Sequence, residues 1–174
     1  MVGHTLPASD RLAFRRWRAD DLDLAAALWS DPEVTRFIGG AAPPDAVAAR
    51  LAAEIASEAE VGFQYWPIFQ RSDGAHVGCC GLRPYRPAER IHELGVHILP
   101  AFWRRGLALE AARAVIAHAF GPLRARALFA GHNPHNDASR SLLARLGFRY
   151  THDELYPPTG LLHPSYLLER RERD

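Results

Sequence analysis

The sequence predicts a mixed α/β domain. Three observations indicate this class: helical spacing of apolar residues in the early segments, three strand-like segments in succession, and a later strand–helix–strand unit followed by two more strands. A chain of 174 residues, 48% of them hydrophobic, is long enough for one hydrophobic core and needs no linker. We therefore expect a single domain over residues 1–174, with an ordered core over about residues 10–170.

The first part of the chain predicts one strand followed by three helices. The segment RLAFRRWR, residues 11–18, interleaves apolar and basic side chains, as a strand with one exposed face requires. The two aspartates that follow suit the start of a helix, because carboxylates interact favourably with the positive end of its dipole. Pro32 begins a short helix over residues 33–37, and apolar residues at four-residue spacing predict a third helix over about residues 45–60.

The middle of the chain predicts an antiparallel meander of three strands. Residues 63–71 and 76–85 are strand-like, and the sequence Ser-Asp-Gly-Ala between them is typical of a hairpin turn. A loop over residues 86–90 leads into a third strand, in which apolar residues alternate with polar residues or glycine until Pro100.

Two helices and three strands are predicted after the meander. The tract Trp103-Arg104-Arg105-Gly106-Leu107-Ala108 opens a helix with one apolar face, which Gly121 and Pro122 end. Residues 127–131 predict a short strand.

The last helix is predicted from its two ends. Asn136 or Asp137 caps it and Gly147 closes it. Residues 148–155 and 165–170 predict the final strands, and the charged tail over residues 169–174 is expected to fray.

Composition narrows the classes of partner and chemistry. A net charge of +1 is far from the excess of positive charge that nucleic-acid-binding proteins carry. No apolar run approaches the roughly 20 residues of a membrane helix. The first residues lack a signal-peptide pattern and the two cysteines are adjacent, so we expect a cytoplasmic protein without nucleic-acid or membrane partners. The excess of Ala, Arg, Gly and Pro indicates a GC-rich bacterial gene. All 21 basic residues are arginine, which excludes lysine Schiff-base chemistry and the phosphate-loop lysine of NTPases.

The helix that follows Pro100 begins with features of an anion site. The first four N–H groups of a helix have no partner within it, and the helix dipole places partial positive charge there. Gly106 and Ala108 leave space for a ligand, and Arg104 and Arg105 add charge, so a pyrophosphate fits this end. An ordinary turn with two solvated arginines is the alternative.

The same tract resembles the acetyl-CoA signature Q/R-x-x-G-x-G/A of the GCN5-related N-acetyltransferases, the GNAT superfamily. Trp103 stands in the first position, as in the ribosomal-protein-alanine N-acetyltransferase-like (RimJ/RimL-type) branch, and Ala108 stands in the last. Three other segments match this branch in order: RLAFRRWRADDLDLAAALWSDPEVTRFI, GAHVGCCGL and NPHNDASRSLLARLGF. The resemblance therefore covers nearly the whole chain.

The resemblance implies a GNAT-like fold with a mostly antiparallel central sheet and flanking helices. In this fold the strand of Glu93 and the strand of Leu128 lie parallel and splay apart, and the pantetheine arm of acetyl-CoA enters the gap. Acetyl-CoA is then the co-substrate, and no metal is implied. The implied cofactor contacts are Ile98, Leu99, Arg104, Arg105, Gly106, Leu107, Ala108 and Asn136.

Acetyl transfer to an amine requires a base, because an aliphatic amine is mostly protonated at pH 7. Glu93 is the first candidate, since it lies on the strand leading to the implied cofactor loop and the resembling family often has a glutamate there. His97 lies on the same face of that strand and is the alternative base. Two alternatives remain open: Glu93 is solvated or paired with an arginine, and His97 has a structural role.

Asn136 and Ser139 form a second constellation at a helix start. Asparagine is a good N-cap, so a structural role is one interpretation. In the resembling family the asparagine contacts the pantetheine arm and a serine or tyrosine lies near the thioester sulfur, which implies a cofactor contact for Asn136 and a proton donor in Ser139. His132 and His135 have H-x-x-H spacing, but no further ligand accompanies them, so no metal site is expected.

The sequence thus predicts an acetyl-CoA-dependent N-acetyltransferase in which a primary amine attacks the thioester directly. The alternative is a non-catalytic acyl-CoA-binding or regulatory module with the same fold. Acidic residues dominate the segments that flank the acceptor side in the resembling family: Asp20, Asp21, Asp31, Glu33, Glu54, Glu58, Glu60, Asp153 and Glu154, accompanied by Tyr156 and His163. We therefore expect a cationic acceptor, either a peptide N-terminal α-amine, which has the lower pKa, or a small polyamine-like molecule. Whether the protein is a monomer or a homodimer stays open.

Overall fold

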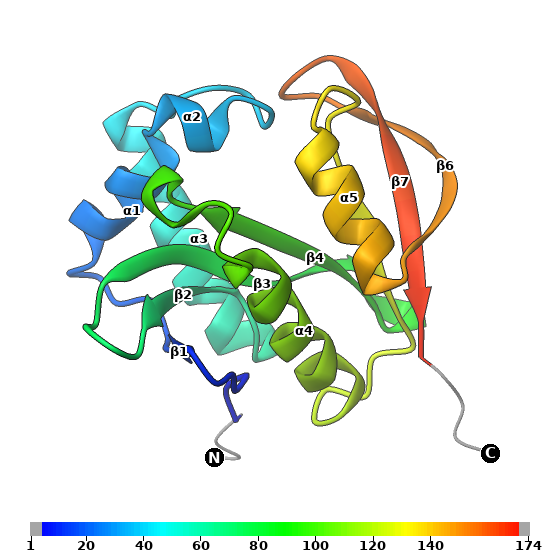
Figure 1. The fold of residues 1–174 in the computed structure, drawn as a ribbon, viewed down its shortest axis with the longest axis horizontal. Coiled ribbons are helices and arrows are strands. Elements are labelled where there is room, and N and C mark those ends of the chain that lie inside the picture. Colours follow the sequence, from blue (N-terminus) through cyan, green and yellow to red (C-terminus); the bar gives the residue numbers. More distant parts are fainter. Residues whose placement is uncertain (1–4, 171–174) are drawn as a thin grey trace.

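The computed structural model describes residues 5–170. In chain order the elements are β1 (Leu12–Phe14), α1 (Leu22–Trp29), α2 (Pro32–Thr35), α3 (Pro44–Val61), β2 (Tyr65–Gln70), β3 (His76–Arg86), the 3-10 turn η1 (Pro87–Glu89), β4 (Ile91–Ile98), the 3-10 turn η2 (Pro100–Phe102), α4 (Leu107–Phe120), β5 (Ala127–Gly131), α5 (Asp137–Leu146), β6 (Arg149–Tyr156) and β7 (Leu161–Glu169) (Figure 1). The strands form one sheet in the order β1-β2-β3-β4-β5-β7-β6. Within residues 5–170, no helix has both the length and the apolar character needed to cross a membrane.

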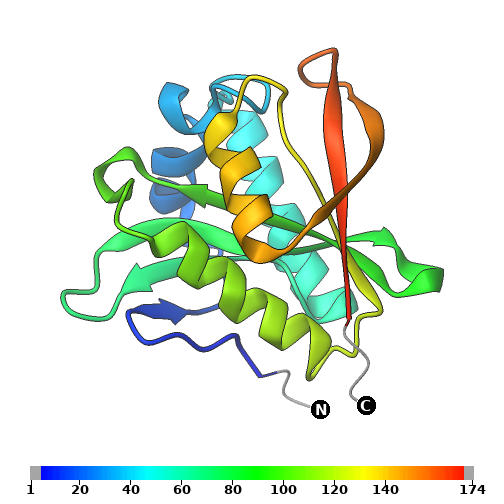
Figure 2. The same ribbon diagram turned by 45° about the vertical axis from the view of Figure 1, so that its right-hand side comes forward.

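Helices cover both faces of this sheet. Figure 2 shows α4 and α5 in front of the sheet and α3 behind it. The face toward α4 carries one core cluster, which includes Trp66 and Leu94, and the opposite face packs on α1 and α3 through a second cluster, which includes Trp29 and Tyr65. Because side chains alternate along a strand, Leu94 points into the first cluster and Glu93 points to the face of the second.

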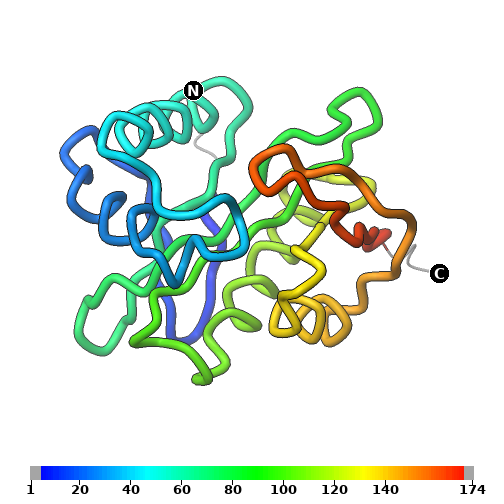
Figure 3. The backbone as a smooth tube through the Cα atoms, turned by 90° about the horizontal axis from the view of Figure 1, so that it is seen from above, coloured from blue at the N-terminus to red at the C-terminus, as the bar shows by residue number. Residues whose placement is uncertain are grey.

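The parallel strands β4 and β5 pair only at their first residues. Their register runs from Ile91↔Ala127 to Glu93↔Phe129, although β4 continues to Ile98. All other neighbouring strands are antiparallel, which confirms the predicted mostly antiparallel sheet with one parallel pair. Seen from above, β1 to β4 with α1 to α3 form one half of the chain, and β5 to β7 with α5 form the other (Figure 3). Glu93 is therefore the last residue of β4 to pair before the two halves separate.

Two contacts join these halves beyond the point of separation. The side-chain amide of Asn133 donates to the backbone carbonyl of Phe37 at 3.3 Å. The loop after α2 also meets the turn between β6 and β7, since a Cβ added at Gly39 would lie only 3.1 Å from Cβ of Pro158. The two halves are thus tied together on the side of α2.

Gly95 allows an aromatic ring to lie on the centre of β4. A Cβ at this position would lie 2.2 Å from the hydroxyl oxygen of Tyr65, far inside van der Waals contact. Tyr65 belongs to β2 and pairs with Gly81 of β3. Its ring therefore reaches across β3 and lies between the positions of Glu93 and His97.

Helix α4 begins later than the sequence predicts. Residues Pro100–Phe102 form η2, and the helix starts at Leu107. The residues just before it cannot be helical, because Arg104 and Gly106 have φ values of 59° and 74°.

Two strand predictions also need correction. β1 ends at Phe14, and Trp17 beyond it is a core residue whose indole N–H donates to the carbonyl of Tyr65 at 2.6 Å. β7 begins at Leu161 and includes Glu169, which pairs with Ala127 instead of fraying. β7 is longer than its local sequence pattern predicts, because it forms hydrogen bonds with β5 on one side and β6 on the other. Residues 171–174 of the predicted frayed tail lie outside the described residues.

Candidate active site

The start of α4 presents backbone N–H groups that carry no side-chain cap in the described chain. Gly106 is the N-cap residue, and its carbonyl accepts the N–H of Glu110 at 3.1 Å. The side chain of Leu107 is buried, so only its backbone is available to a ligand. Arg104 and Arg105 are exposed directly before the helix. These groups together provide the partial and full positive charges that bind an anion at a helix end.

A hollow of about 470 Å³ adjoins this helix start, and Arg105 and Leu107 contribute to its wall. Arg11 also lines it, but this side chain pairs with Glu110 (Nε–Oε2 2.6 Å) and donates to the carbonyl of Arg105 at 3.1 Å. Arg71 and Arg105 have no carboxylate within 4 Å anywhere in residues 5–170, although Nε of Arg71 donates to two backbone carbonyls and Asp10 also lines the hollow.

The edge of β4 that faces the gap offers backbone groups at alternate residues. The N–H of Leu99 donates to the carbonyl of Val77 at 2.9 Å, and its own carbonyl accepts an N–H from the following 3-10 turn. Backbone groups alternate in direction along a strand, so those of Val96 and Ile98 point away from β3 and toward the gap. The Ile98 carbonyl accepts the indole N–H of Trp103 at 2.7 Å. The predicted contact at Ile98 thus keeps its N–H, the one at Leu99 has no free backbone group, and Val96 is an additional candidate.

Asn136 and Ser139 lie at the start of α5, on the other side of the gap from β4. The side-chain oxygen of Asn136 accepts the backbone N–H of Ser139 at 3.1 Å, which makes Asn136 the N-cap. The amide nitrogen of Asn136 and the hydroxyl of Ser139 form no hydrogen bond to any described residue. Both groups remain available to a ligand in addition to the structural role of the cap.

Glu93 lies on the face of β4 opposite α4, where pairing with β5 ends. Its carboxylate is partly buried and has no hydrogen bond or ion pair to the part of the chain that the structure describes. Burial raises the pKa of Glu93 above its ordinary value, while Arg83 and Arg50 oppose the rise and Glu154 adds to it. An unpaired carboxylate with a raised pKa is suited to accept a proton.

Four elements besides β4 contribute ionisable groups around Glu93. Arg83 of β3 is paired with Glu54 of α3 at 2.6 Å and lies over the ring of Tyr65, 4.3 Å from its centroid. Burial raises the pKa of Tyr65 and of Tyr156, and the charge of Glu93 raises both further, so both hydroxyls are neutral at physiological pH. Both tyrosines are therefore hydrogen-bond donors near the candidate base.

His97 has the environment of a structural histidine. Its Nδ1 accepts the indole N–H of Trp29 at 3.4 Å and lies 3.7 Å from Sγ of Cys79, and the ring of Tyr65 meets its ring edge-on at 5.8 Å. Burial, aided by Arg50 and Arg83, lowers the pKa of His97 to about 3. An imidazole with so low a pKa holds a transferred proton poorly, so the geometry favours Glu93 over the alternative base His97.

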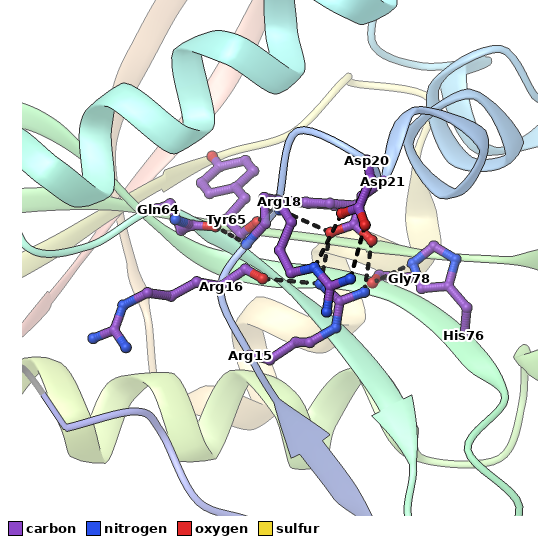
Figure 4. Close-up of polar contacts among 10 residues, drawn as sticks. Arg15, Arg16, Arg18, Asp20, Asp21, Gln64, Tyr65, His76 and Gly78 are labelled. Carbon is purple, nitrogen blue, oxygen red and sulfur yellow. Dashed lines mark hydrogen bonds and ion pairs between the residues drawn. The ribbon is translucent and has the colours of Figure 1, made fainter.

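Most acidic residues expected on the acceptor side have structural partners instead. Figure 4 shows Asp21 in a two-point pair with Arg15 and Asp20 beside Arg18, and the closest atoms of these pairs are 2.6 and 2.8 Å apart. The other engaged residues are Asp31, which caps α2, Glu54 with Arg83, Glu58 with Arg16, Asp153 with Tyr150, and Glu154 with Tyr85. Asp20, Asp21, Glu54 and Glu58 are thus compensated by arginine, whereas Asp31, Asp153 and Glu154 accept hydrogen bonds from neutral groups, so fewer negative charges face the acceptor side than the sequence suggests.

His132 and His135 do not form a metal site with each other. His132 Nδ1 donates to the carbonyl of Asn133 at 2.7 Å, and its Nε2 lies 3.1 Å from the hydroxyl of Tyr166. Nowhere in residues 5–170 are three or more His, Cys, Asp or Glu side chains placed to hold a metal ion.

Arg50 and Tyr65 are site residues that the sequence pattern did not single out. One signal was present: Arg50 and Glu54 interrupt the apolar stripe of α3 that Val47 and Leu51 define, and a charged residue on a buried stripe needs a partner. Glu54 finds its partners on β2 and β3, and Arg50 lies over the ring of Trp29 of α1; these contacts become visible only in the folded chain.

Comparison with known proteins adds a family match. The model of the family described as Acetyltransferase (GNAT) domain matches residues 11–149. The uncharacterised N-acetyltransferase p20 of Bacillus licheniformis is 27% identical over 143 residues, which cover 81% of this chain and 80% of that protein.

Solved structures share the fold. An acetyltransferase from Agrobacterium tumefaciens superposes with a TM-score of 0.80 and 22% identity over 95% of this chain and 96% of that chain. RimL, a ribosomal L7/L12 alpha-N-protein acetyltransferase in complex with coenzyme A, superposes with a TM-score of 0.79 and 14% identity over 94% of this chain and 96% of that chain.

Proposed function

The chain belongs to the GNAT family of N-acetyltransferases, and we propose that it transfers the acetyl group of acetyl-CoA to a primary amine by direct attack of the amine on the thioester. The acceptor is a peptide N-terminal α-amine or a small amine. The observation that carries this proposal is the position of Glu93, an unpaired carboxylate with a raised pKa at the point where β4 and β5 separate.

The residues present fit acetyl-CoA as the co-substrate. The pyrophosphate would be held by the first N–H groups of α4, from Leu107 and Ala108, with charge from Arg104 and Arg105. The pantetheine arm would bind the free backbone groups of β4 and, across the gap, the side-chain amide of Asn136. Gly106 keeps the approach to the helix end open, since it adds no side chain there.

Glu93 acts as the general base in this proposal. An α-amine has an ordinary pKa of about 7.7–8.0 and must lose a proton before it can attack. Because the pKa of Glu93 is raised, it lies closer to the pKa of the amine. Proton transfer from the amine to Glu93 is therefore less unfavourable than transfer to an ordinary carboxylate. Tyr65 and Tyr156 are neutral donors that can orient the amine or a water molecule between it and Glu93.

Acetyl-CoA supplies an activated acyl group, and the chain must then protonate the departing thiolate. Ser139 is the proposed donor, because its hydroxyl forms no hydrogen bond to any described residue. A hydroxyl of ordinary acidity is a weak acid, so its contribution is expected to be smaller than that of Glu93 and to consist mainly of a hydrogen bond to sulfur.

Thiol release from acetyl-CoA across a panel of amines tests the function. The panel contains peptides with free and blocked N-termini, small polyamines, and simple alkylamines, and calorimetry measures acetyl-CoA binding in parallel. Thiol release that requires a free amine, with the acetylated amine identified by mass, would support the proposal. Binding without release on any amine would favour the non-catalytic acyl-CoA-binding module.

A further inference from the structure

Arg50 is a largely buried cation that the proposed reaction does not use. It lies on α3 with its guanidinium over the ring of Trp29, 4.2 Å from the centroid. Its Nε is buried without a hydrogen-bond partner, and no carboxylate in residues 5–170 lies within 4 Å of its nitrogens. A buried charge without a charged partner is costly, so its retention needs an explanation.

The nearest carboxylate along the helix is already engaged. Glu54, one turn further on α3, accepts from Arg83 at 2.6 Å and from the backbone N–H of Tyr65 at 2.8 Å. Arg83 therefore has its ion pair, and Arg50 is the uncompensated member of the two neighbouring guanidiniums. Burial, and after it the repulsion from Arg83, lowers the pKa of Arg50, while Cys79, Glu54 and Tyr65 oppose this decrease.

Arg50 lies on the same face of the sheet as the groups proposed to act on the acceptor, because the ring of Trp29 beneath its guanidinium belongs to the core cluster that contains Tyr65. Its charge lowers the pKa values of Glu93, Tyr65 and Tyr156, which belong to β4, β2 and β6. The cation thus lies on the Glu93 side of the sheet, away from Arg104 and Arg105 at the start of α4. Glu54 and Arg83 form an ion pair, whereas no carboxylate in residues 5–170 lies within 4 Å of the nitrogens of Arg50.

We propose that Arg50 binds a carboxylate carried by the acceptor amine, so that the natural acceptor is an amine with a nearby negative charge. This inference rests on the proposed function. The guanidinium presents a planar fork that matches a carboxylate at two points. Its Nε is fully buried, so a bound carboxylate would meet the two terminal nitrogens, which form no hydrogen bond to residues 5–170. The carboxylate has two sources, an acidic side chain or terminus of a peptide and the acid group of a small amino acid.

Matched acceptor pairs in the wild-type protein test the preference directly. The peptide pair is Ala-Glu-Ala amide and Ala-Gln-Ala amide, and the small pair is β-alanine and β-alanine amide. Rates are compared per concentration of neutral amine, because a nearby carboxylate raises the pKa of the amine. We expect kcat/KM to favour the acid of at least one pair by about 10- to 100-fold, the range for one charge-assisted contact, and the favoured pair identifies the source.

Variants assign the preference to one side chain. Arg50→Gln is expected to reduce the ratio of acid to amide about 10- to 100-fold, and Arg50→Lys is expected to retain part of it because the charge remains. Arg113→Gln, on the exposed face of α4, is the matched control and should leave the ratio unchanged. If the contact between Arg50 and Trp29 is purely structural, its loss would leave part of the protein unfolded. An unfolded fraction lowers the rates on acid and amide equally, so it does not change their ratio.

The outcomes separate the two levels of the proposal. Equal or faster use of the amides by the wild type, or an unchanged ratio in Arg50→Gln, would overturn the carboxylate site and leave the acetyltransferase in place. If Arg50→Gln fails to fold, the wild-type preference and the Arg50→Lys ratio still decide. Acetyl-CoA binding without turnover on any amine would overturn the proposed function and the carboxylate site with it.

Discussion

The two sides of the candidate site are built in different ways. Most of the proposed cofactor contacts lie in one contiguous tract, from Ile98 to Ala108, in which a strand ends and a helix begins, and Asn136 of α5 joins them across the gap. The acceptor side assembles Arg50, Tyr65, Arg83, Glu93 and Tyr156 from five separate elements. The first side depends on backbone geometry that nearby residues determine, and the second depends on packing between distant segments.

This difference affects what charge can do on each side. Arg104 and Arg105 are exposed, so water screens them until a ligand arrives, and they cost little in the free protein. The acceptor side holds partly buried charges, which shift one another's pKa values and are sensitive to each neighbour. Variants on the two sides should therefore separate cofactor binding from chemistry and stability.

Glu93→Gln should give the largest effect and should leave the cofactor side intact. Loss of the general base is expected to reduce kcat about 100-fold or more at neutral pH, with partial recovery at higher pH as the amine deprotonates without help. Calorimetry should give an unchanged acetyl-CoA affinity. A wild-type pH–rate profile in this variant would place the base elsewhere.

The double variant Arg104→Ala and Arg105→Ala should produce the opposite pattern. Removing two phosphate contacts is expected to weaken coenzyme A binding by about 10- to 100-fold, because an exposed charge-assisted contact contributes only part of its full 1.5–3 kcal/mol. Thermal stability should change little, since both side chains are exposed. Arg113→Ala is the control, and equal coenzyme A affinity in both variants would contradict the pyrophosphate assignment.

Gly95→Ala tests whether packing maintains the acceptor side. The added methyl group would overlap the hydroxyl of Tyr65, so we expect a loss of about 1–3 kcal/mol in the free energy of unfolding, measured with urea, and lower turnover. Gly131→Ala is the control, because the nearest atom to its added Cβ is 3.5 Å away. Equal stability of the two variants would mean that Tyr65 moves aside freely.

The pH dependence of stability should reveal the raised pKa of Glu93. The folded protein holds the proton more tightly than the unfolded chain, so the free energy of unfolding falls as pH rises from the unfolded pKa, about 4.3, through the raised folded value. Arg83 and Arg50 reduce this loss and Glu154 increases it. Glu93→Gln has no carboxyl to titrate at this position, so its free energy of unfolding should rise relative to that of the wild type across this pH window. Urea unfolding at each pH measures both, and a constant difference between the two proteins would mean that the pKa of Glu93 is not shifted.

Ser139→Ala is expected to have the smallest effect. A several-fold decrease in kcat without a change in KM for acetyl-CoA would fit a hydrogen bond to the departing sulfur. The cap should survive, because Asn136 bonds to the backbone N–H of residue 139 and not to its side chain. An unchanged rate would leave Ser139 with a structural role alone.

Local sequence was sufficient for much of the fold and for the helix start that is proposed to bind the cofactor. The alternation in β4, the turn signals of the β2–β3 hairpin and the Asn136 and Gly147 caps of α5 act over a few residues, so each could be recognised in isolation. The glycine at position 106 likewise marks the helix start through its own φ preference. The length of β7 was missed because it depends on two neighbouring strands that the local pattern does not contain.

The acceptor side was decided by tertiary structure. The sequence placed the candidate base Glu93 on the strand that forms β4, but its pKa is set by burial, which raises it, by Arg83 and Arg50, which lower it, and by Glu154, which raises it, and these three residues lie on three other elements. The sequence also counted acidic residues as a negative surface, whereas folding pairs Asp21 with Arg15 and, within residues 5–170, leaves Arg50 without a carboxylate partner. Composition gives the number of charges, but only the distances between them determine which charges cancel and which remain to act on a substrate.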